Sequence, residues 1–357
     1  MAKEEKGKKT LEDVIKEINK TYGVGSVMDG EQLESYSDVI STGSLGLDIN
    51  LGIGGLPLGK IVEIYGWESS GKSTLCQTII GNAQKKGLKC LYLDGENSIS
   101  EIYATNLGIS LKDLLIIQLD EKAGEGAYNK MEMLVETGEV GVVVIDSYNS
   151  LQPAKIINGE MGENSMGVHA RMLGQVVMKA NSLSSRHKTL FLFVGQVREK
   201  IGVIWGSPET PQGGNALKFY SHIRLKVSRS LTTENSVIGV NKEKLGNKTT
   251  VKIEKTKFGS PFKENSFSII YKEGIDKYTE LLELAHEYEI IKVWGKQVTE
   301  LFGSGVKYTK DEYIQFLKEQ PEFFKDVRDR VLNAVKGLKE NIVEATTEDA
   351  IIQSIEE

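Results

Sequence analysis

The chain has 357 residues, the length of about two typical domains. Hydrophobic residues make up 39% and charged residues 26%, which is typical of a globular protein with a sizeable core. The two cysteines, Cys76 and Cys90, exclude a disulfide framework and a four-cysteine zinc site, and they favour a reducing compartment. There is no apolar run of about 18 residues and no apolar segment behind the lysine-rich N-terminus, so we expect no membrane helix, no secretory signal and a cytoplasmic location.

Charge is distributed unevenly along the chain. Lys and Arg total 44 against 50 Asp and Glu, a formal net charge of −6. Residues 340–357 hold six acidic residues and no Lys or Arg, so all of the net negative charge lies there. Residues 242–263 carry seven Lys against two Glu. An acidic tail beside a basic body leaves a nucleic-acid partner open despite the negative total.

The first predicted element is a helix near the N-terminus. Apolar residues recur there on one helical face (Leu11, Val14, Ile15, Ile18), and Thr10 is placed to cap it. Three glycines between residues 23 and 30 then break the pattern. We expect residues 1–35 to form a helix and a hinge, with the helix packed on a neighbouring protomer; the alternative is that it folds back on its own core.

From residue 61 the pattern becomes strands alternating with helices. We expect strands at 61–65, 90–94, 114–119, 140–146, 189–194, 223–227 and 251–255, with helices such as 73–86 and 125–136. This alternation predicts an α/β fold with a mostly parallel, doubly wound sheet. The composition changes near Gly274 to helical, charged sequence. We therefore expect a core over 36–273, a small C-terminal α/β domain over 274–339 whose last helix ends near 338, and a frayed acidic tail over 340–357.

Residues 66–73, G-W-E-S-S-G-K-S, satisfy the pattern G-x-x-x-x-G-K-[ST]. Its glycines allow successive backbone N–H groups to wrap a phosphate, while Lys72 reaches the β- and γ-phosphates and the Ser73 hydroxyl ligates Mg²⁺. An apolar strand before it and a helix after it make a chance glycine turn the weaker interpretation. The predicted nucleotide-binding residues here are Gly66, Glu68, Ser69, Ser70, Gly71, Lys72, Ser73 and Thr74.

A second acidic motif completes the predicted ATPase site. The β-branched strand 140–146 ends in Asp146, as a Walker-B strand does, and we expect Asp146 to hold Mg²⁺ rather than to cap a helix. Hydrolysis also needs a group that orients water. Glu96, which follows strand 90–94, is the candidate base, with Glu68 as the alternative.

Beyond these motifs, residues 40–263 resemble the bacterial RecA recombinases. The resemblance rests on segments that general P-loop ATPases lack, at 40–48, 54–66, 159–162, 169–172, 196–203, 206–210 and 213–220. It implies a RecA-type core that binds ATP and Mg²⁺, forms a helical homo-polymer on single-stranded DNA and exchanges strands with double-stranded DNA in recombination, repair and the SOS response. It also implies a single-strand-binding protein or a loader as a further partner.

The resemblance implies roles for individual residues. Glu96 matches the catalytic glutamate, Tyr103 the residue that stacks on adenine, and Gln196 the glutamine that senses the γ-phosphate. Lys255 and Lys257 match two lysines that reach the ATP of the neighbouring protomer. Without the resemblance, the residues favour the alternative that Lys255 and Lys257 form one solvated face of an edge strand.

Two glycine-rich segments, 156–168 and 197–215, follow core strands and are expected to bind DNA. Cations would neutralise phosphates, apolar side chains would wedge between bases, and glycine N–H groups would contact a phosphate. The predicted DNA-binding residues are Arg171, Arg198 and Lys200 for charge, Met166, Ile204 and Trp205 as wedges, and Gly213 and Gly214. Packing of the wedge residues into their own core is the alternative.

The chain departs from the family pattern at four positions. Trp67 stands where proline is usual, and Met178 where arginine is usual. Ser100 replaces an aspartate near the adenine, which puts base selectivity in question. Gly195 replaces an asparagine before Gln196, and we expect it to weaken the coupling of ATP to the second DNA segment. These departures suggest that the chain is a phage-encoded, plasmid-encoded or divergent bacterial member of the family it resembles.

Four further hypotheses follow from the sequence. Three lysines of the C-terminal domain are candidates for capturing duplex DNA (Lys292, Lys296, Lys307), and the acidic tail is a candidate brake on DNA uptake. A ring helicase on the same core and a nucleotide-dependent scaffold without turnover are the alternative functions. The sequence shows no appended helicase domain, which argues against the ring helicase. A scaffold without turnover would tolerate the loss of Glu96.

Overall fold

The structure is a computed structural model of the chain. It describes residues 9–22, 27, 38–97, 99–118, 124–160, 167–199, 209–229, 236–238, 243–302 and 305–356, with side chains of the last helix described as far as Leu338. Two compact units are present, Met1–Ser37 and Asp38–Glu357. In the first, helix α1 spans Leu11–Tyr22. Its N-terminus is capped as expected, because the Asp13 backbone N–H donates to the Thr10 hydroxyl at 3.2 Å.

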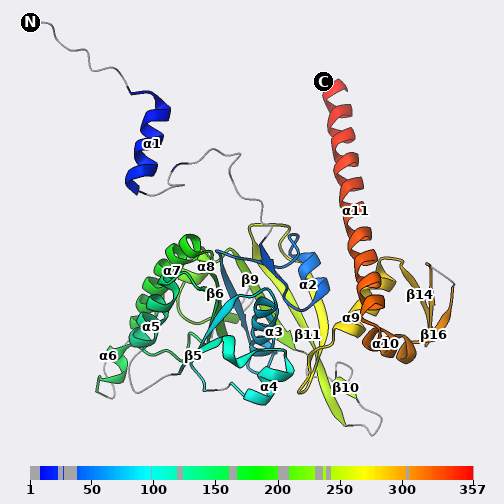
Figure 1. The fold of residues 1–357 in the computed structure, drawn as a ribbon, viewed down its shortest axis with the longest axis horizontal. Coiled ribbons are helices and arrows are strands. Elements are labelled where there is room, and N and C mark those ends of the chain that lie inside the picture. The colour runs from blue at the N-terminus through cyan, green and yellow to red at the C-terminus, as the bar shows by residue number, and fades with distance from the viewer. Residues whose placement is uncertain are drawn as a thin grey trace, which may run out of the picture. The chain divides into compact units, whose positions relative to one another are not determined.

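The second unit is built on one central sheet (Figure 1). Its strand order is β13-β12-β11-β9-β3-β7-β6-β4-β5. The parallel strands are β3 (Ile61–Gly66), β4 (Lys89–Asp94), β5 (Leu114–Gln118), β6 (Val140–Asp146), β7 (Leu190–Glu199) and β9 (Ile223–Arg229). The antiparallel end is formed by β11 (Lys244–Thr256), β12 (Glu264–Ile270) and β13 (Gly274–Ile275). The predicted α/β fold with a mostly parallel sheet is confirmed.

Helices cover both faces of this sheet, as Figure 1 shows. On one face α3 (Lys72–Lys85) and α4 (Glu101–Asn106) pack with side chains such as Val142 and Val144. On the other, α5 (Gly124–Glu136) and α7 (Val168–His187) pack with Val143 and Ile145. Neighbouring residues of a strand point to opposite faces, so β6 is buried on both sides and reads as a continuous apolar run.

Short elements complete the core. They are β1 (Val39–Ile40), α2 (Leu45–Asn50), β2 (Leu56–Pro57), the 3₁₀ turn η2 (Leu111–Asp113), α6 (Ala154–Ile157), β8 (Glu209–Pro211), α8 (Ala216–Tyr220) and β10 (Ser236–Ile238). Strand β7 runs five residues further than predicted, because β8 pairs with its end. Gln196 and Arg198 therefore lie on a strand, where the sequence suggested that the second glycine-rich segment begins at residue 197.

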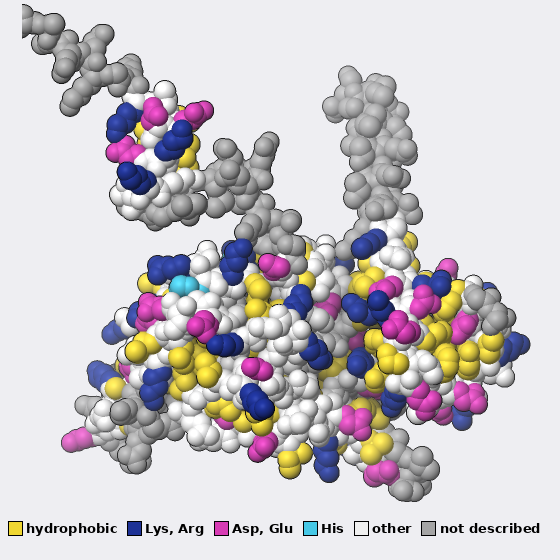
Figure 2. Space-filling view, viewed as in Figure 1, with side chains coloured by type: hydrophobic (Ala, Val, Ile, Leu, Met, Phe, Trp, Pro, Cys, Tyr) yellow, Lys and Arg dark blue, Asp and Glu magenta, His cyan; other side chains and the backbone are white. Residues whose placement is uncertain are grey.

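The C-terminal lobe has its own hydrophobic core beside the main sheet. It contains α9 (Lys277–Glu287), a three-stranded antiparallel sheet of β14 (Ile291–Trp294), β15 (Gln297–Glu300) and β16 (Lys307–Thr309), and helices α10 (Lys310–Glu319) and α11 (Pro321–Glu356). Leu281, Val298, Tyr313 and Val327 are at its centre. Hydrophobic side chains also gather on the outside of this lobe (Figure 2).

The last helix is longer than predicted. The sequence suggested a helix ending at residue 338 and then a frayed tail, whereas α11 is helical to Glu356. Residues 338–356 contain neither glycine nor proline, so nothing in them stops a helix. Within the described chain, no helix is both long enough and apolar enough to cross a membrane.

Candidate nucleotide site and candidate DNA interface

The loop between β3 and α3 requires glycine at both of its ends. A Cβ on Gly66 would lie 1.9 Å from the Val227 carbonyl oxygen. Gly71 has a φ of +103°, and a Cβ there would lie 2.5 Å from the Ile269 Cδ1 atom. The loop therefore passes directly against β9 and β12. Its backbone N–H groups, followed by the start of a 14-residue helix, form an anion cradle.

A cavity of about 380 Å³ opens at this loop. It is lined by Ser69, Ser70, Gly71, Lys72, Ser73, Thr74 and Tyr103, all of which the sequence predicted, and by Arg229, Asn247, Thr249, Ile269, Tyr271 and Lys272, which it did not. The Tyr103 and Thr74 hydroxyls lie 2.8 Å apart. The second group comes from the antiparallel end of the sheet. No local motif marks it, because only strand pairing brings it to the cradle.

Lys72 lies inside this cavity, with only 7% of its surface exposed. Its Nζ atom donates to the Trp67 carbonyl at 2.6 Å. Burial lowers the pKa of Lys72, whereas the carboxylates of Asp146 and Glu96 raise it. The ammonium is thus held among acidic groups and one carbonyl, and phosphate oxygens would be stronger partners.

Asp146 ends β6 beside the cradle and is 3% exposed. It accepts a hydrogen bond from the Tyr92 hydroxyl at 2.6 Å. Burial raises its pKa, and hydrogen bonds from Tyr92 and Ser73 act in the opposite direction. A buried carboxylate next to a serine hydroxyl is an oxygen donor set that suits Mg²⁺. Among the described residues no group of three or more His, Cys, Asp or Glu could hold a metal, so phosphate oxygens would complete the coordination.

Glu96 and Gln196, a hundred residues apart, meet next to this site. The Gln196 side-chain amide donates to Glu96 Oε1 at 3.1 Å, and the Ser147 hydroxyl donates to the same oxygen at 2.9 Å. Asn149 accepts from the Gln196 backbone N–H at 2.9 Å. The structure therefore brings the predicted base together with the predicted sensor. Glu68, the alternative base, is exposed in the loop.

A buried polar network that the sequence did not reveal crosses the centre of the sheet. Glu63 on β3 pairs with Arg224 on β9 at 2.5 Å, and the Tyr148 hydroxyl lies 3.4 Å from Glu63. Arg224 also stacks over the Tyr65 ring, whose hydroxyl bonds Glu254 on β11. Burial raises the pKa of Glu63, and Arg224 opposes that shift. The network therefore runs from Glu254, which precedes Lys255 in the chain, to Tyr148, which packs against the residue before Gln196.

Lys255 lies near the end of β11, where the pairing with β9 is irregular, and Lys257 directly follows the strand. The Lys255 Nζ atom donates to the carbonyls of Lys218 and Phe219 at 2.9 and 3.0 Å. These carbonyls belong to the last turn of α8, so Lys255 satisfies a helix C-terminus in its own chain. Partial burial lowers its pKa, as do Lys257 and Arg224.

The predicted DNA-binding residues fall into two groups. Arg171, in the first turn of α7, and Arg198, on β7, are exposed. Gly213 and Gly214 have φ values of +102° and +84°, and a Cβ on Gly213 would lie 2.4 Å from Leu173. These glycines are therefore needed for the turn itself. The remaining four, Met166, Lys200, Ile204 and Trp205, lie outside the described residues.

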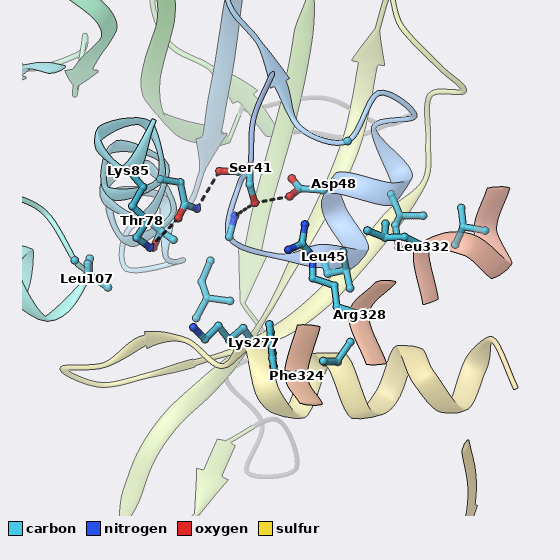
Figure 3. A pocket seen from close by; sticks show the side chains of 18 of the residues that line it. Ser41, Leu45, Asp48, Thr78, Lys85, Leu107, Lys277, Phe324, Arg328 and Leu332 are labelled. Carbon is cyan, nitrogen blue, oxygen red and sulfur yellow. Dashed lines mark hydrogen bonds between the residues drawn. The ribbon is translucent and has the colours of Figure 1, made fainter. Parts of the chain in front are cut away.

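A larger cavity, of about 850 Å³, lies between the core and the C-terminal lobe. Figure 3 shows Lys85 on α3, Lys277 on α9 and Arg328 on α11 around it, together with the hydrogen bond between Ser41 and Asp48. None of the predicted nucleotide-site or DNA-binding residues lines this groove. The loop after β3 and the carboxylates beside it therefore remain the candidate site.

A strand–glycine loop–helix cradle, a buried acid on the neighbouring strand and a mostly parallel sheet define a P-loop ATPase of the α/β class. A family model for the RecA N-terminal domain matches residues 9–276. The proteins named Protein RecA of Gluconobacter oxydans and Colwellia psychrerythraea are 43% and 42% identical over 330 and 323 residues. They cover 90% and 89% of this chain, and 92% and 90% of their own lengths are matched. That of Rhodospirillum rubrum is 43% identical over 331 residues, 90% of this chain and 87% of its own length.

The chain belongs to the RecA family. It is a recombinase that hydrolyses nucleotide in response to DNA, forms filaments and exchanges strands in DNA repair. The resemblance seen in the sequence is thereby confirmed, as are nucleotide binding, DNA binding and self-assembly.

Proposed function

We propose that the cradle of residues 66–74 binds ATP with Mg²⁺ and that Glu96 drives its hydrolysis. The observation that carries the proposal is the grouping of Lys72, Asp146 and Glu96, two of them buried, beyond the carboxyl ends of β3, β6 and β4 respectively. Lys72 would leave the Trp67 carbonyl for the β- and γ-phosphates, and Tyr103 would lie against the adenine. Ser73 and Asp146 would hold Mg²⁺, which neutralises phosphate charge when it is bound.

In this proposal Glu96 is the general base. Its Oε1 atom is fixed by hydrogen bonds from Ser147 and Gln196, which leaves the other carboxylate oxygen available to a water molecule. The water gives its proton to Glu96 while its oxygen attacks the γ-phosphorus, and the bond to the β-phosphate oxygen breaks. Gln196 shares the carboxylate, so it is placed to respond when a γ-phosphate arrives.

A neighbouring copy would complete the site. Lys255 lies at the irregular end of β11 and Lys257 directly after it, and the hydrogen bonds of Lys255 go to two helix-end carbonyls. An ammonium can exchange such neutral acceptors for phosphate oxygens at little cost. Charge supplied across an interface stabilises phosphoryl transfer as an arginine finger does, and it makes filament contact and ATP binding interdependent.

DNA would bind through the two glycine-rich segments 156–168 and 197–215, together with Arg171; the second segment includes Arg198 and the turn at Gly213 and Gly214. We propose that single-stranded DNA binds first and double-stranded DNA second. A single-strand-binding protein or a loader would assist the first step, and the protein would act in the cytoplasm. Because phosphates are neutralised by cations, affinity for single strands falls steeply with salt.

The test is ATP hydrolysis measured with and without single-stranded DNA, alongside strand exchange. DNA is expected to raise the rate, and Lys72→Ala is expected to lower it by at least about 100-fold because it removes charge from the phosphates. Lys112→Ala, at an exposed position of η2 away from the cradle, is the matched control. Turnover that ignores DNA, or a Lys72→Ala protein with normal turnover, would contradict the proposal.

A further inference from the structure

A direct hydrogen bond connects the phosphate loop to β8, a short strand within the second glycine-rich segment 197–215. The Trp67 indole N–H donates to Glu209 Oε1 at 2.6 Å. Glu209 is the first residue of β8, and Lys226 on β9 pairs with its other carboxylate oxygen. The two hydrogen-bonded residues are 142 positions apart, and the contact is specific to a tryptophan at position 67, since a proline there offers no donor.

The other end of Trp67 contacts the residue that must move when nucleotide binds. Its carbonyl accepts from Lys72 Nζ at 2.6 Å. A triphosphate in the cradle would take that ammonium away, so the Trp67 carbonyl would lose its charged donor and keep only the longer hydrogen bond from the Ser70 backbone N–H at 3.3 Å. Trp67 is 42% exposed, so its ring is free to change position when the loop rearranges.

Glu209 is in turn joined to the DNA-facing end of β7. Strand β8 pairs with β7 in the register Val197↔Pro211 and Arg198↔Thr210. Arg198 is a predicted DNA contact, and Gln196 precedes this pairing by one residue. A displacement of Glu209 is therefore transmitted through the β7–β8 ladder to the strand that carries both side chains.

We propose that Trp67 is a positioning residue that couples occupancy of the phosphate loop to the β7–β8 pair through its hydrogen bond to Glu209. This connection is separate from the one through Gln196. It begins at Trp67, near the start of the phosphate loop, whereas Gln196 contacts Glu96. The inference rests on the proposed function, since it needs nucleotide in the cradle and DNA on the segment after β7. Hydrogen bonds from Lys226 and then from the Trp67 indole lower the pKa of Glu209, which favours a charged acceptor.

The experiment compares Trp67→Phe, which keeps an aromatic ring but removes the donor, with Glu209→Met, which removes the acceptor. Trp294→Phe, at an 81% exposed site on β14, is the control. ATP turnover is measured without DNA and with saturating single-stranded DNA. We expect each variant to lower the ratio of DNA-stimulated to DNA-free turnover about tenfold, the magnitude of one hydrogen bond to a charged group, whatever its effect on DNA-free turnover.

The double variant decides whether the two residues act as one unit. Trp67→Phe/Glu209→Met should lose no more stimulation than either single variant. In ¹⁹F NMR of the 5-fluorotryptophan-labelled full chain, the resonance absent from Trp67→Phe should shift on addition of a non-hydrolysable ATP analogue. That shift should be smaller in Glu209→Met.

Three results would overturn the inference. They are normal stimulation in Trp67→Phe, losses that multiply in the double variant, and a parallel fall of DNA-free and DNA-stimulated rates, which would mark simple damage to the loop. Each of them leaves the proposed function intact as long as the wild-type chain responds to DNA. A wild-type chain indifferent to DNA would instead contradict the proposed function.

Discussion

Tyr148 fills the space that a side chain at position 195 would need. A Cβ on Gly195 would lie 2.3 Å from the Tyr148 hydroxyl oxygen and 2.5 Å from its ring carbon Cζ. The Tyr148 ring is fully buried, and its hydroxyl reaches toward Glu63. The glycine before Gln196 is thus accounted for by packing: a large neighbour occupies the place of the asparagine side chain that the family pattern has there.

This packing predicts that Gly195→Ala destabilises the protein by about 1–3 kcal/mol, since the added methyl group overlaps a buried ring. Urea denaturation of Gly195→Ala measures the change. Tyr148→Val should remove most of the penalty, whereas Tyr148→Phe should not, because the clash involves the ring as well as the hydroxyl. Equal stabilities of Gly195→Ala and the wild type would refute the packing account.

Glu96→Gln should slow ATP turnover about 10²- to 10⁴-fold, the usual contribution of a general base, while nucleotide binding is retained. The amide can still accept from Gln196 and Ser147, so the local geometry should persist. Single-turnover hydrolysis and equilibrium nucleotide binding separate the two effects. Glu68→Gln serves as the comparison, and if it were the slower of the two, the role of base would pass to Glu68.

Asp146→Asn should lower turnover about 100-fold and raise the Mg²⁺ concentration needed, without loss of stability. Burial raises the pKa of Asp146, so the neutral amide removes an unfavourable buried charge, and it can still accept from Tyr92. Mg²⁺ titrations of turnover, combined with thermal unfolding, test both statements. A strong fall in Tm, or an unchanged Mg²⁺ requirement, would argue against the assigned role.

The lowered pKa of His222 predicts how the stability of the fold varies with pH. Burial, with the charges of Lys257, Lys60 and Lys255, lowers its pKa to about 4. Its Nδ1 atom accepts from the Ile61 backbone N–H at 3.3 Å, so the ring is neutral in the folded state. The folded chain then binds fewer protons than the unfolded chain between the two pKa values. The stability that the neutral His222 contributes is therefore complete above about pH 6.5 and is lost as the pH falls through about 4.

Urea denaturation between pH 7.5 and pH 4.5 checks this sign, with His222→Gln as the reference. Glutamine can accept from Ile61 but does not titrate, so the loss of stability at low pH should be smaller in the variant. If the wild type and the variant lose stability in parallel, His222 is not responsible for the dependence.

The fold and the cradle follow from local sequence. The strand–glycine–helix pattern at residues 61–86 and the β-branched run ending at Asp146 can both be recognised from consecutive residues. Most strands accordingly lie where the periodicity places them. The end of α11 was missed because no residue stops a helix there, and the end of β7 was missed because its partner strand β8 comes from later in the chain.

Contacts between distant residues could not be derived in the same way. Arg229, Tyr271 and Lys272 reach the phosphate cavity through antiparallel pairing, which no spacing rule encodes. The Trp67–Glu209 bond and the Tyr148–Gly195 contact depend on substitutions whose partners lie 142 and 47 positions away along the chain. Sequence identifies such residues as unusual, but only the folded chain shows what each one contacts.

The most direct test of the shared ATP site mixes two inactive proteins. Lys72→Ala cannot hold the phosphates, and Lys255→Ala/Lys257→Ala cannot reach a neighbour's ATP. If the lysines act across the interface, a 1:1 mixture should regain DNA-stimulated turnover, with about one quarter of the contacts in a random copolymer pairing an intact cradle with intact lysines. A mixture as inactive as its components, although it forms filaments on single-stranded DNA, would show that each ATP is served within one chain.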